Sequence, residues 1–148
     1  MKDWETNFSA IVNGESIQYE IAVDQGVQAT VLYENIEFTG HSLGGGLASA
    51  SALATDGKAT TFNAAGLTNK LKTNLGIEKG ISDNIRAYIT RGEFVDFNQR
   101  LLGVRAEGQK IIIPARYNIL STTVRQYQRI RNHMIGNHIK RLKKEFLK

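Results

Sequence analysis

Residues Gly40-His41-Ser42-Leu43-Gly44 fit the pattern G-x-S-x-G, in which a serine stands at a sharp turn between a strand and a helix. Such a turn holds the serine in a strained backbone conformation and exposes its hydroxyl above the sheet, where it can act as a nucleophile. We expect Gly40 and Gly44 to be required, because a Cβ at either position would collide with the adjacent strand or helix. The N–H of Leu43 is expected at the N-terminus of the helix, where it can stabilise an oxyanion.

The residues on either side of this turn predict the strand and the helix that it needs. Residues 35–39 alternate apolar and polar side chains, as a short strand does. Residues 47–54 are small and favour helix, which predicts a helix lying close against a sheet, and Asp56-Gly57 marks its end.

Further elements follow from the same kind of pattern. Strands are predicted at 58–62, 85–90 and 110–113, and helices at about 15–33, 67–75, 95–102 and 121–148. Strands that alternate with helices predict an α/β fold with a mostly parallel sheet flanked by helices. The length of 148 residues suits one domain, with the last helix as a tail.

The composition excludes several classes of protein. Hydrophobic residues make up 41% of the chain and charged residues 22%, which excludes a disordered chain. The chain has no cysteine, which excludes thiolate metal sites, a cysteine nucleophile and disulfides. No stretch approaches the roughly 18 uninterrupted apolar residues of a membrane span. The first ten residues do not form a signal peptide, and the compartment stays undetermined.

Charge is unevenly distributed along the chain. Up to Glu107 there are nine Lys and Arg residues against thirteen Asp and Glu residues, and from Gly108 onward there are ten against one. Basic and apolar residues interleave after Ser121, a pattern typical of a helix that binds an anionic membrane surface or a partner. A solvated basic helix explains the same pattern. Nucleic acid is not favoured as a partner, because no nucleic-acid motif or aromatic stacking platform accompanies the charges.

Three segments resemble the class 3 lipases, a family of α/β-hydrolases. Thr39-Gly-His-Ser-Leu-Gly-Gly-Gly-Leu-Ala48 is similar to their nucleophile elbow, including the histidine before the serine. Asp3-Trp4-Glu5-Thr6-Asn7 resembles their D-W-x-T-N segment, and Thr61-Phe-Asn-Ala-Ala-Gly-Leu67 resembles the strand and loop after the elbow in bacterial members. The resemblance implies a serine esterase that cleaves carboxylic esters of lipids or phospholipids.

The resemblance also implies a catalytic triad of serine, acid and histidine in that chain order. Ser42 is the nucleophile. For the acid we prefer Glu93, which follows the strand at 85–90, over Asp96, whose ordinary role would be a helix N-cap.

For the general base we prefer His133 in Arg131-Asn-His-Met-Ile135, with His138 as the alternative. His41 lies inside the elbow and is expected to have a structural role. The i,i+5 spacing of His133 and His138 places them on different faces of a helix, so we expect no metal site. No organic cofactor is expected either.

The family has strands before its D-W-x-T-N segment, and one of them supplies the second oxyanion donor. Here the chain begins at Met1-Lys2, so we expect an N-terminally truncated domain. Loss of one such donor costs about 100- to 1000-fold in turnover. The chain is then a fragment of a longer hydrolase, a minimal enzyme with weak activity, or an inactive relative. Apolar surface left by missing strands would favour a homo-oligomer or a partner chain.

Two functions therefore stand side by side. The first is a serine lipase or phospholipase, and because bacterial members often sit in secreted or delivered effector proteins, an effector role is implied with it. The second is a non-catalytic module that keeps the fold and binds a membrane or a partner.

Overall fold

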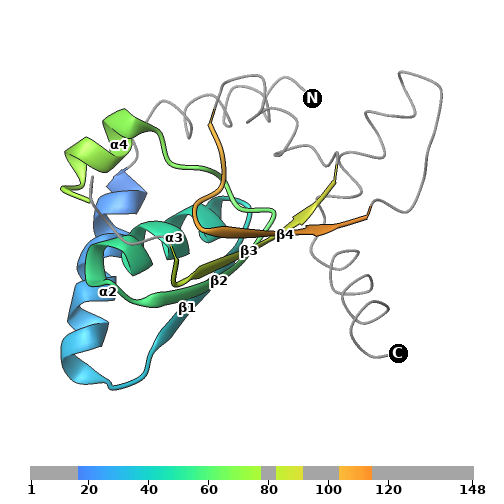
Figure 1. Cartoon of the computed structure of the whole chain (residues 1–148). Coiled ribbons are helices and arrows are strands. Elements are labelled where there is room, and N and C mark those ends of the chain that lie inside the picture. Colours follow the sequence, from blue (N-terminus) through green and yellow to red (C-terminus); the bar gives the residue numbers. More distant parts are fainter. Residues whose placement is uncertain (1–16, 78–82, 92–103, 115–148) are drawn as a thin grey trace.

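The computed structural model describes residues 17–77, 83–91 and 104–114 (Figure 1). Four strands form a parallel sheet in the order β1-β2-β3-β4: Glu37–His41, Lys58–Phe62, Ile85–Thr90 and Gln109–Ile113. Within the described residues three helices accompany it: α2 (Ile17–Leu32), α3 (Leu43–Thr55) and α4 (Asn69–Asn74). The prediction of an α/β fold with a mostly parallel sheet flanked by helices is confirmed.

Element boundaries differ from the prediction mainly around the serine. The strands at 58–62 and 85–90 are as predicted, and β4 begins one residue earlier than predicted. However, β1 continues through Gly40 to His41, and α3 begins at Leu43, four residues before the predicted start. Glycine is a weak strand and helix former, so local preference places both boundaries too far from the turn. A Cβ at Gly40, Gly45 or Gly46 would not fit against the neighbouring atoms, and this close packing outweighs the local preference.

The ends of two helices follow from recognisable signals. Asp56 ends α3 in a left-handed conformation with φ 49°, as the Asp56-Gly57 pair predicted. Helix α4 is shorter than the predicted 67–75, because the Thr68 side chain caps its start by accepting a hydrogen bond from the N–H of Leu71 at 3.1 Å. The predicted helices at 95–102 and 121–148, and the segment Asp3–Asn7, lie outside the described residues.

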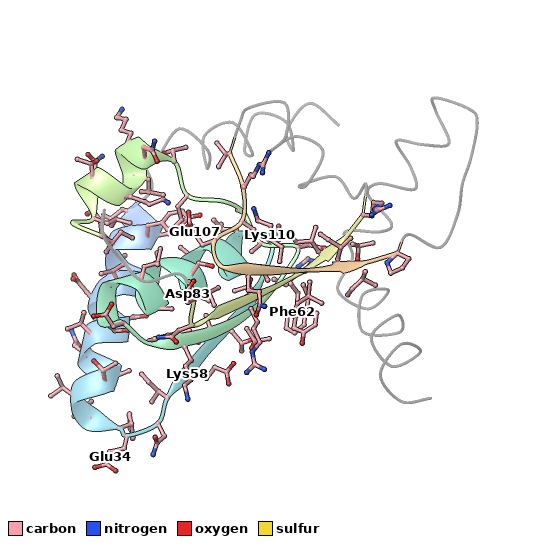
Figure 2. The ribbon with its side chains drawn as sticks, viewed as in Figure 1. Glu34, Lys58, Phe62, Asp83, Glu107 and Lys110 are labelled. Carbon is pink, nitrogen blue, oxygen red and sulfur yellow. The ribbon has the colours of Figure 1, made fainter. Side chains whose placement is uncertain are left out.

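Helices α2 and α3 lie on one side of the sheet (Figure 1), and the alternation of side chains along β2 follows from this layering. Ala59 and Thr61 are fully buried, whereas Lys58 is exposed and Phe62 only partly buried. In Figure 2 the Phe62 side chain points to the side of the sheet away from these helices. The main core therefore lies between β1–β3 and the two helices.

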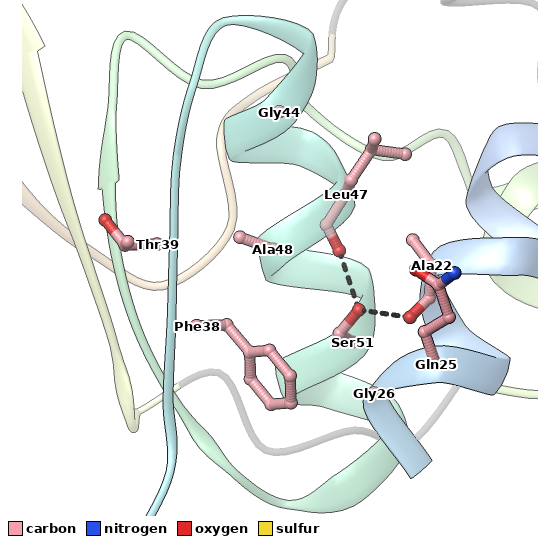
Figure 3. Close-up of a pocket in the computed structure, with 9 residues that line it drawn as sticks. All are labelled: Ala22, Gln25, Gly26, Phe38, Thr39, Gly44, Leu47, Ala48 and Ser51. Atoms are coloured by element: carbon pink, nitrogen blue, oxygen red, sulfur yellow. Dashed lines mark hydrogen bonds between the residues drawn. The ribbon is translucent and has the colours of Figure 1, made fainter. Parts of the chain in front are cut away.

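Small residues let α2 and α3 approach each other closely. A Cβ at Gly26 would lie 2.8 Å from the Cβ of Ser51, a distance that packed side chains do not reach. The Ser51 hydroxyl donates to the carbonyl of Ala22 at 2.8 Å and to that of Leu47 at 3.1 Å (Figure 3). One side chain thus links the two helices at the point where they have no room for larger residues.

Helix α2 was predicted from apolar residues at mixed spacing, and the helix is confirmed. Its buried residues, however, are Tyr19 and Gly26, while Ile17 is 67% and Val31 is 80% exposed. Of the apolar residues from which the helix was predicted, only Val23 packs against the core, and the others are exposed. Among the described residues, no helix has both the length and the apolar character that a membrane crossing requires.

Tyr19 is completely buried against the glycine-rich start of α3. A Cβ at Gly46 would lie 2.4 Å from the Tyr19 hydroxyl. The described part of the chain offers this hydroxyl no hydrogen-bond partner. Burial raises the pKa of Tyr19 from 10.0 to about 12, because the charged phenolate is disfavoured away from water.

We predict that Tyr19 makes the protein less stable at alkaline pH. Its pKa is higher in the folded than in the unfolded protein, so its contribution to stability is complete below pH 10 and is lost as the pH rises towards 12. The free energy of unfolding of the wild type should fall by about 2–3 kcal/mol relative to Tyr19→Phe over this range. Denaturant unfolding of both proteins between pH 8 and 12 tests this, and parallel pH curves would contradict it.

Candidate active site

Ser42 lies between the last residue of β1 and the first residue of α3, at the turn that the G-x-S-x-G pattern predicted. Its backbone has φ 57° and ψ −123°, a conformation that a residue with a side chain rarely adopts. Such a conformation costs about 1–3 kcal/mol and persists only when surrounding contacts enforce it. The Ser42 side chain does not cap α3, although serine is a common capping residue.

The glycines around Ser42 are required at different positions from those that the motif suggested. A Cβ at Gly40 would lie 2.1 Å from the carbonyl oxygen of Gly44, so the predicted collision there is confirmed. At Gly44 the prediction is wrong, because a Cβ would meet nothing within 4 Å. The second tight position is Gly45, where a Cβ would lie 2.6 Å from the Cβ of Ala64. The helix turns Gly44 outward and Gly45 towards the chain after β2.

Hydrogen bonds hold the main chain of Ser42 from both sides. Its N–H donates to the carbonyl of Phe62 at 3.1 Å. Its carbonyl accepts from the N–H of Gly46 at 3.2 Å and from the N–H of Ala65 at 2.9 Å. These bonds attach the turn to α3 and to the chain that follows β2, which explains how the strained conformation is maintained.

Leu43 is the first residue of α3. An α-helix leaves its first N–H groups without partners inside the helix, and its dipole makes this end partly positive. The N–H of Leu43 is therefore one of the N–H groups at the partly positive end of α3. Its role in stabilising an oxyanion stays a prediction.

His41 is the last residue of β1 and lies opposite Phe62 of β2 in the sheet register. It is partly buried. The next pair along this line is Phe62 and Tyr88, whose rings stack with their centroids 5.5 Å apart. His41 thus belongs to a row of ring side chains near the ends of three strands, and its structural role stays a prediction.

The other predicted site residues, Glu93, Asp96, His133 and His138, lie outside the described residues. Strand β3 ends at Thr90, three positions before Glu93 in the sequence. The structure therefore describes the turn of the predicted nucleophile Ser42 and the strand that leads towards the predicted acid. Among the described residues, no group of His, Asp or Glu side chains is arranged to hold a metal ion.

A shallow groove of about 310 Å³ lies beside the turn, between α2, α3 and β1 (Figure 3). Its walls are mostly apolar, and Gly44 on its wall is two residues from Ser42. The residues that line it are Ala22, Gln25, Gly26, Phe38, Thr39, Gly44, Leu47, Ala48 and Ser51.

Two residues that pack around the turn at Ser42, namely Gly45 and Asn63, were not predicted from the sequence. Gly45 was detectable from the unusual run Gly44-Gly45-Gly46, which extends beyond the motif. Asn63 follows β2 in a left-handed conformation with φ 44° and is 1% exposed. A single asparagine directly after a strand was a weak signal, because asparagine is also common in exposed turns.

The sequence of the chain matches a known protein family over nearly its whole length. The Tle-like phospholipase domain of the phospholipase-like family matches residues 1–145. The chain belongs to this phospholipase-like family. The match includes the turn at Ser42, the parallel sheet and the segments that carry the remaining predicted site residues.

An extracellular phospholipase A1 from Serratia liquefaciens is 40% identical to this chain over 78 residues. The matched segment covers 52% of this chain and 24% of the Serratia protein. The phospholipase-like chain thus matches about a quarter of the length of this curated relative. The comparisons support a phospholipase-like family rather than class 3 lipases in particular, and the predicted truncation stays a prediction.

We predict opposite effects for alanine at the two motif glycines. Gly40→Ala should lower the free energy of unfolding by about 2 kcal/mol or more, because the new Cβ must displace the first turn of α3. Gly44→Ala should leave it unchanged or raise it by up to about 1 kcal/mol, because alanine favours the helix and meets open space. Urea denaturation of both variants is the measurement. Equal destabilisation would contradict the described packing.

We also predict that glycine at position 42 relieves backbone strain. Ser42→Gly and Ser42→Ala both remove the hydroxyl, but only glycine adopts φ 57° without steric cost. The Gly variant should be more stable than the Ala variant by about 1 kcal/mol, since glycine also increases the entropy of the unfolded chain. Urea denaturation compares the two, and a more stable Ala variant would show that position 42 is not strained.

Proposed function

We propose that this chain hydrolyses carboxylic ester bonds of phospholipids or other lipids with Ser42 as its nucleophile. The observation that carries the proposal is the backbone of Ser42, which has a positive φ in the turn between a parallel strand and a helix N-terminus. The family match and the name of the Serratia relative support a lipid ester as the substrate.

In the proposed mechanism, Ser42 attacks the ester carbonyl while His133 takes the proton from its hydroxyl. Glu93 orients the imidazole of His133 and stabilises its charged form. The N–H of Leu43 donates a hydrogen bond to the oxyanion of the tetrahedral intermediate. His133 returns the proton to the alcohol, which leaves, and then activates the water that releases the acyl group from Ser42. Asp96 and His138 remain the alternatives for the acid and the base.

Two further features suit a lipid substrate. The groove between α2, α3 and β1, which Gly44 lines, has the apolar side chains of Ala22, Phe38 and Leu47 on its walls, and these match an alkyl chain in chemistry. The ten basic residues after Glu107 are proposed to attract the anionic surface on which phospholipids lie.

A non-catalytic module that binds membranes is the second candidate. The same basic residues favour it, because membrane attraction requires no nucleophile. Lipid binding that survives Ser42→Ala is expected under both functions, so only the chemistry of Ser42 separates them.

We predict that a fluorophosphonate probe labels Ser42 covalently. Labelling should be absent in Ser42→Ala and slowed by roughly 100-fold or more in His133→Ala, because the hydroxyl then lacks its general base. Intact-mass analysis and peptide mapping measure the adduct and its position. Glu93→Ala and Asp96→Ala, compared in the same assay, identify the acid.

His138→Ala removes the alternative base from the same segment and should label at nearly the wild-type rate if His133 is the base, whereas a loss of labelling would assign the base to His138. Release of fatty acid from phosphatidylcholine vesicles then tests the substrate class. A folded wild-type chain that does not label at Ser42 would overturn the esterase function and favour the binding module.

A further inference from the structure

Asn63 is buried at the point where the nucleophile turn and the end of β3 come together. Its side chain is 1% exposed, and its backbone is left-handed with φ 44°. A buried amide needs hydrogen-bond partners, and a left-handed residue with a side chain is uncommon. Unlike an asparagine in an exposed turn, Asn63 needs a structural reason for both its burial and its backbone conformation.

Asn63 is hydrogen-bonded to β3 through both its main chain and its side chain. Its N–H donates to the carbonyl of Tyr88 at 2.8 Å, and its Oδ1 accepts from the N–H of Thr90 at 2.8 Å. The residue therefore bridges from β2 to β3 with main chain and side chain together. These bonds define the course of the chain at the last residue of β3.

The neighbours of Asn63 are attached to Ser42. The carbonyl of Phe62, one residue before, accepts from the N–H of Ser42 at 3.1 Å. The N–H of Ala65, two residues after, donates to the carbonyl of Ser42 at 2.9 Å. A shift of residues 62–65 would therefore move both the main chain of Ser42 and the end of β3.

We propose that Asn63 is a positioning residue, whose amide sets the end of β3, and hence the start of the acid-bearing segment, relative to the Ser42 nucleophile. This inference rests on the proposed function. The acid candidate Glu93 follows Thr90 by three positions, and the N–H that Asn63 holds belongs to the last residue of β3. The next N–H, that of Arg91, donates to the carbonyl of Ile113 at 2.9 Å, so the end of β3 is held by Asn63 on one side and by β4 on the other. Asparagine suits the position because it tolerates a left-handed backbone and has a neutral carbonyl oxygen as acceptor.

Substitutions at position 63 can separate the amide from the backbone conformation. Asn63→Gly keeps the left-handed backbone and removes the acceptor. Asn63→Asp keeps both an oxygen acceptor and tolerance for this conformation. Thr68→Ala is the matched control, because it also removes a side-chain oxygen that accepts from a backbone N–H, but at the start of α4.

The experiment measures the rate of fluorophosphonate labelling at Ser42 in the folded full-length chain from pH 5 to 9. Asn63→Gly should label roughly 10- to 100-fold more slowly than the wild type, because misplacement by about 1 Å has effects of this size. The midpoint of its pH profile should move to lower pH, because a displaced acid no longer raises the pKa of the general base. Asn63→Asp should recover most of the rate, and Thr68→Ala should match the wild type.

Hydrogen exchange at the Thr90 amide gives a readout that does not depend on the chemistry. Exchange should be faster in Asn63→Gly and remain slow in Thr68→Ala. If the buried charge prevents Asn63→Asp from folding, Asn63→Gly and Thr68→Ala decide the question together.

The inference is overturned if Asn63→Gly labels like the wild type, if Thr68→Ala slows labelling equally, or if the pH midpoint stays unchanged while the rate falls. Absence of labelling in the folded wild type has a different meaning, because it removes the proposed function itself.

Discussion

The absence of a side chain at Gly40 is the constraint on which the turn at Ser42 depends. Strand β1 passes so close to the first turn of α3 that a Cβ at Gly40 would lie 2.1 Å from the carbonyl oxygen of Gly44. Between the strand and the helix, which approach this closely, Ser42 has a positive φ of 57°. The strain at one residue is thus the consequence of packing at its neighbours, as expected of a functional turn.

The rest of the described sheet supports this turn through the ends of its strands. Main-chain bonds connect Ser42 to Phe62, Asn63 to Tyr88, and Arg91 to Ile113. Each strand end is therefore attached to the next, from β1 to β4. Because loops at the carboxyl edge of a parallel sheet carry the functional residues in many α/β proteins, a rigid edge is what a multi-residue site needs.

On the other side of the turn, small residues bring the helices close to the sheet and to each other. Gly45 contacts Ala64, and Gly26 contacts Ser51, with no room for a Cβ at either glycine. The stretch that resembled a hydrolase elbow is therefore also a packing surface. In this chain the glycine and alanine residues that follow the five residues of the motif therefore serve the packing of α3.

The sequence by itself determined the α/β class, the strands at 58–62 and 85–90, and the turn at Ser42, because alternation, helix-forming runs and a short motif are local signals. It could not place Gly45 or Asn63 in the site, nor show that Gly44 faces open space. The surroundings of Gly44 and Gly45 depend on which side of α3 faces the chain after β2. The burial of Asn63 depends on its contact with β3. Only the tertiary structure decides such contacts, because they join residues that are distant in sequence.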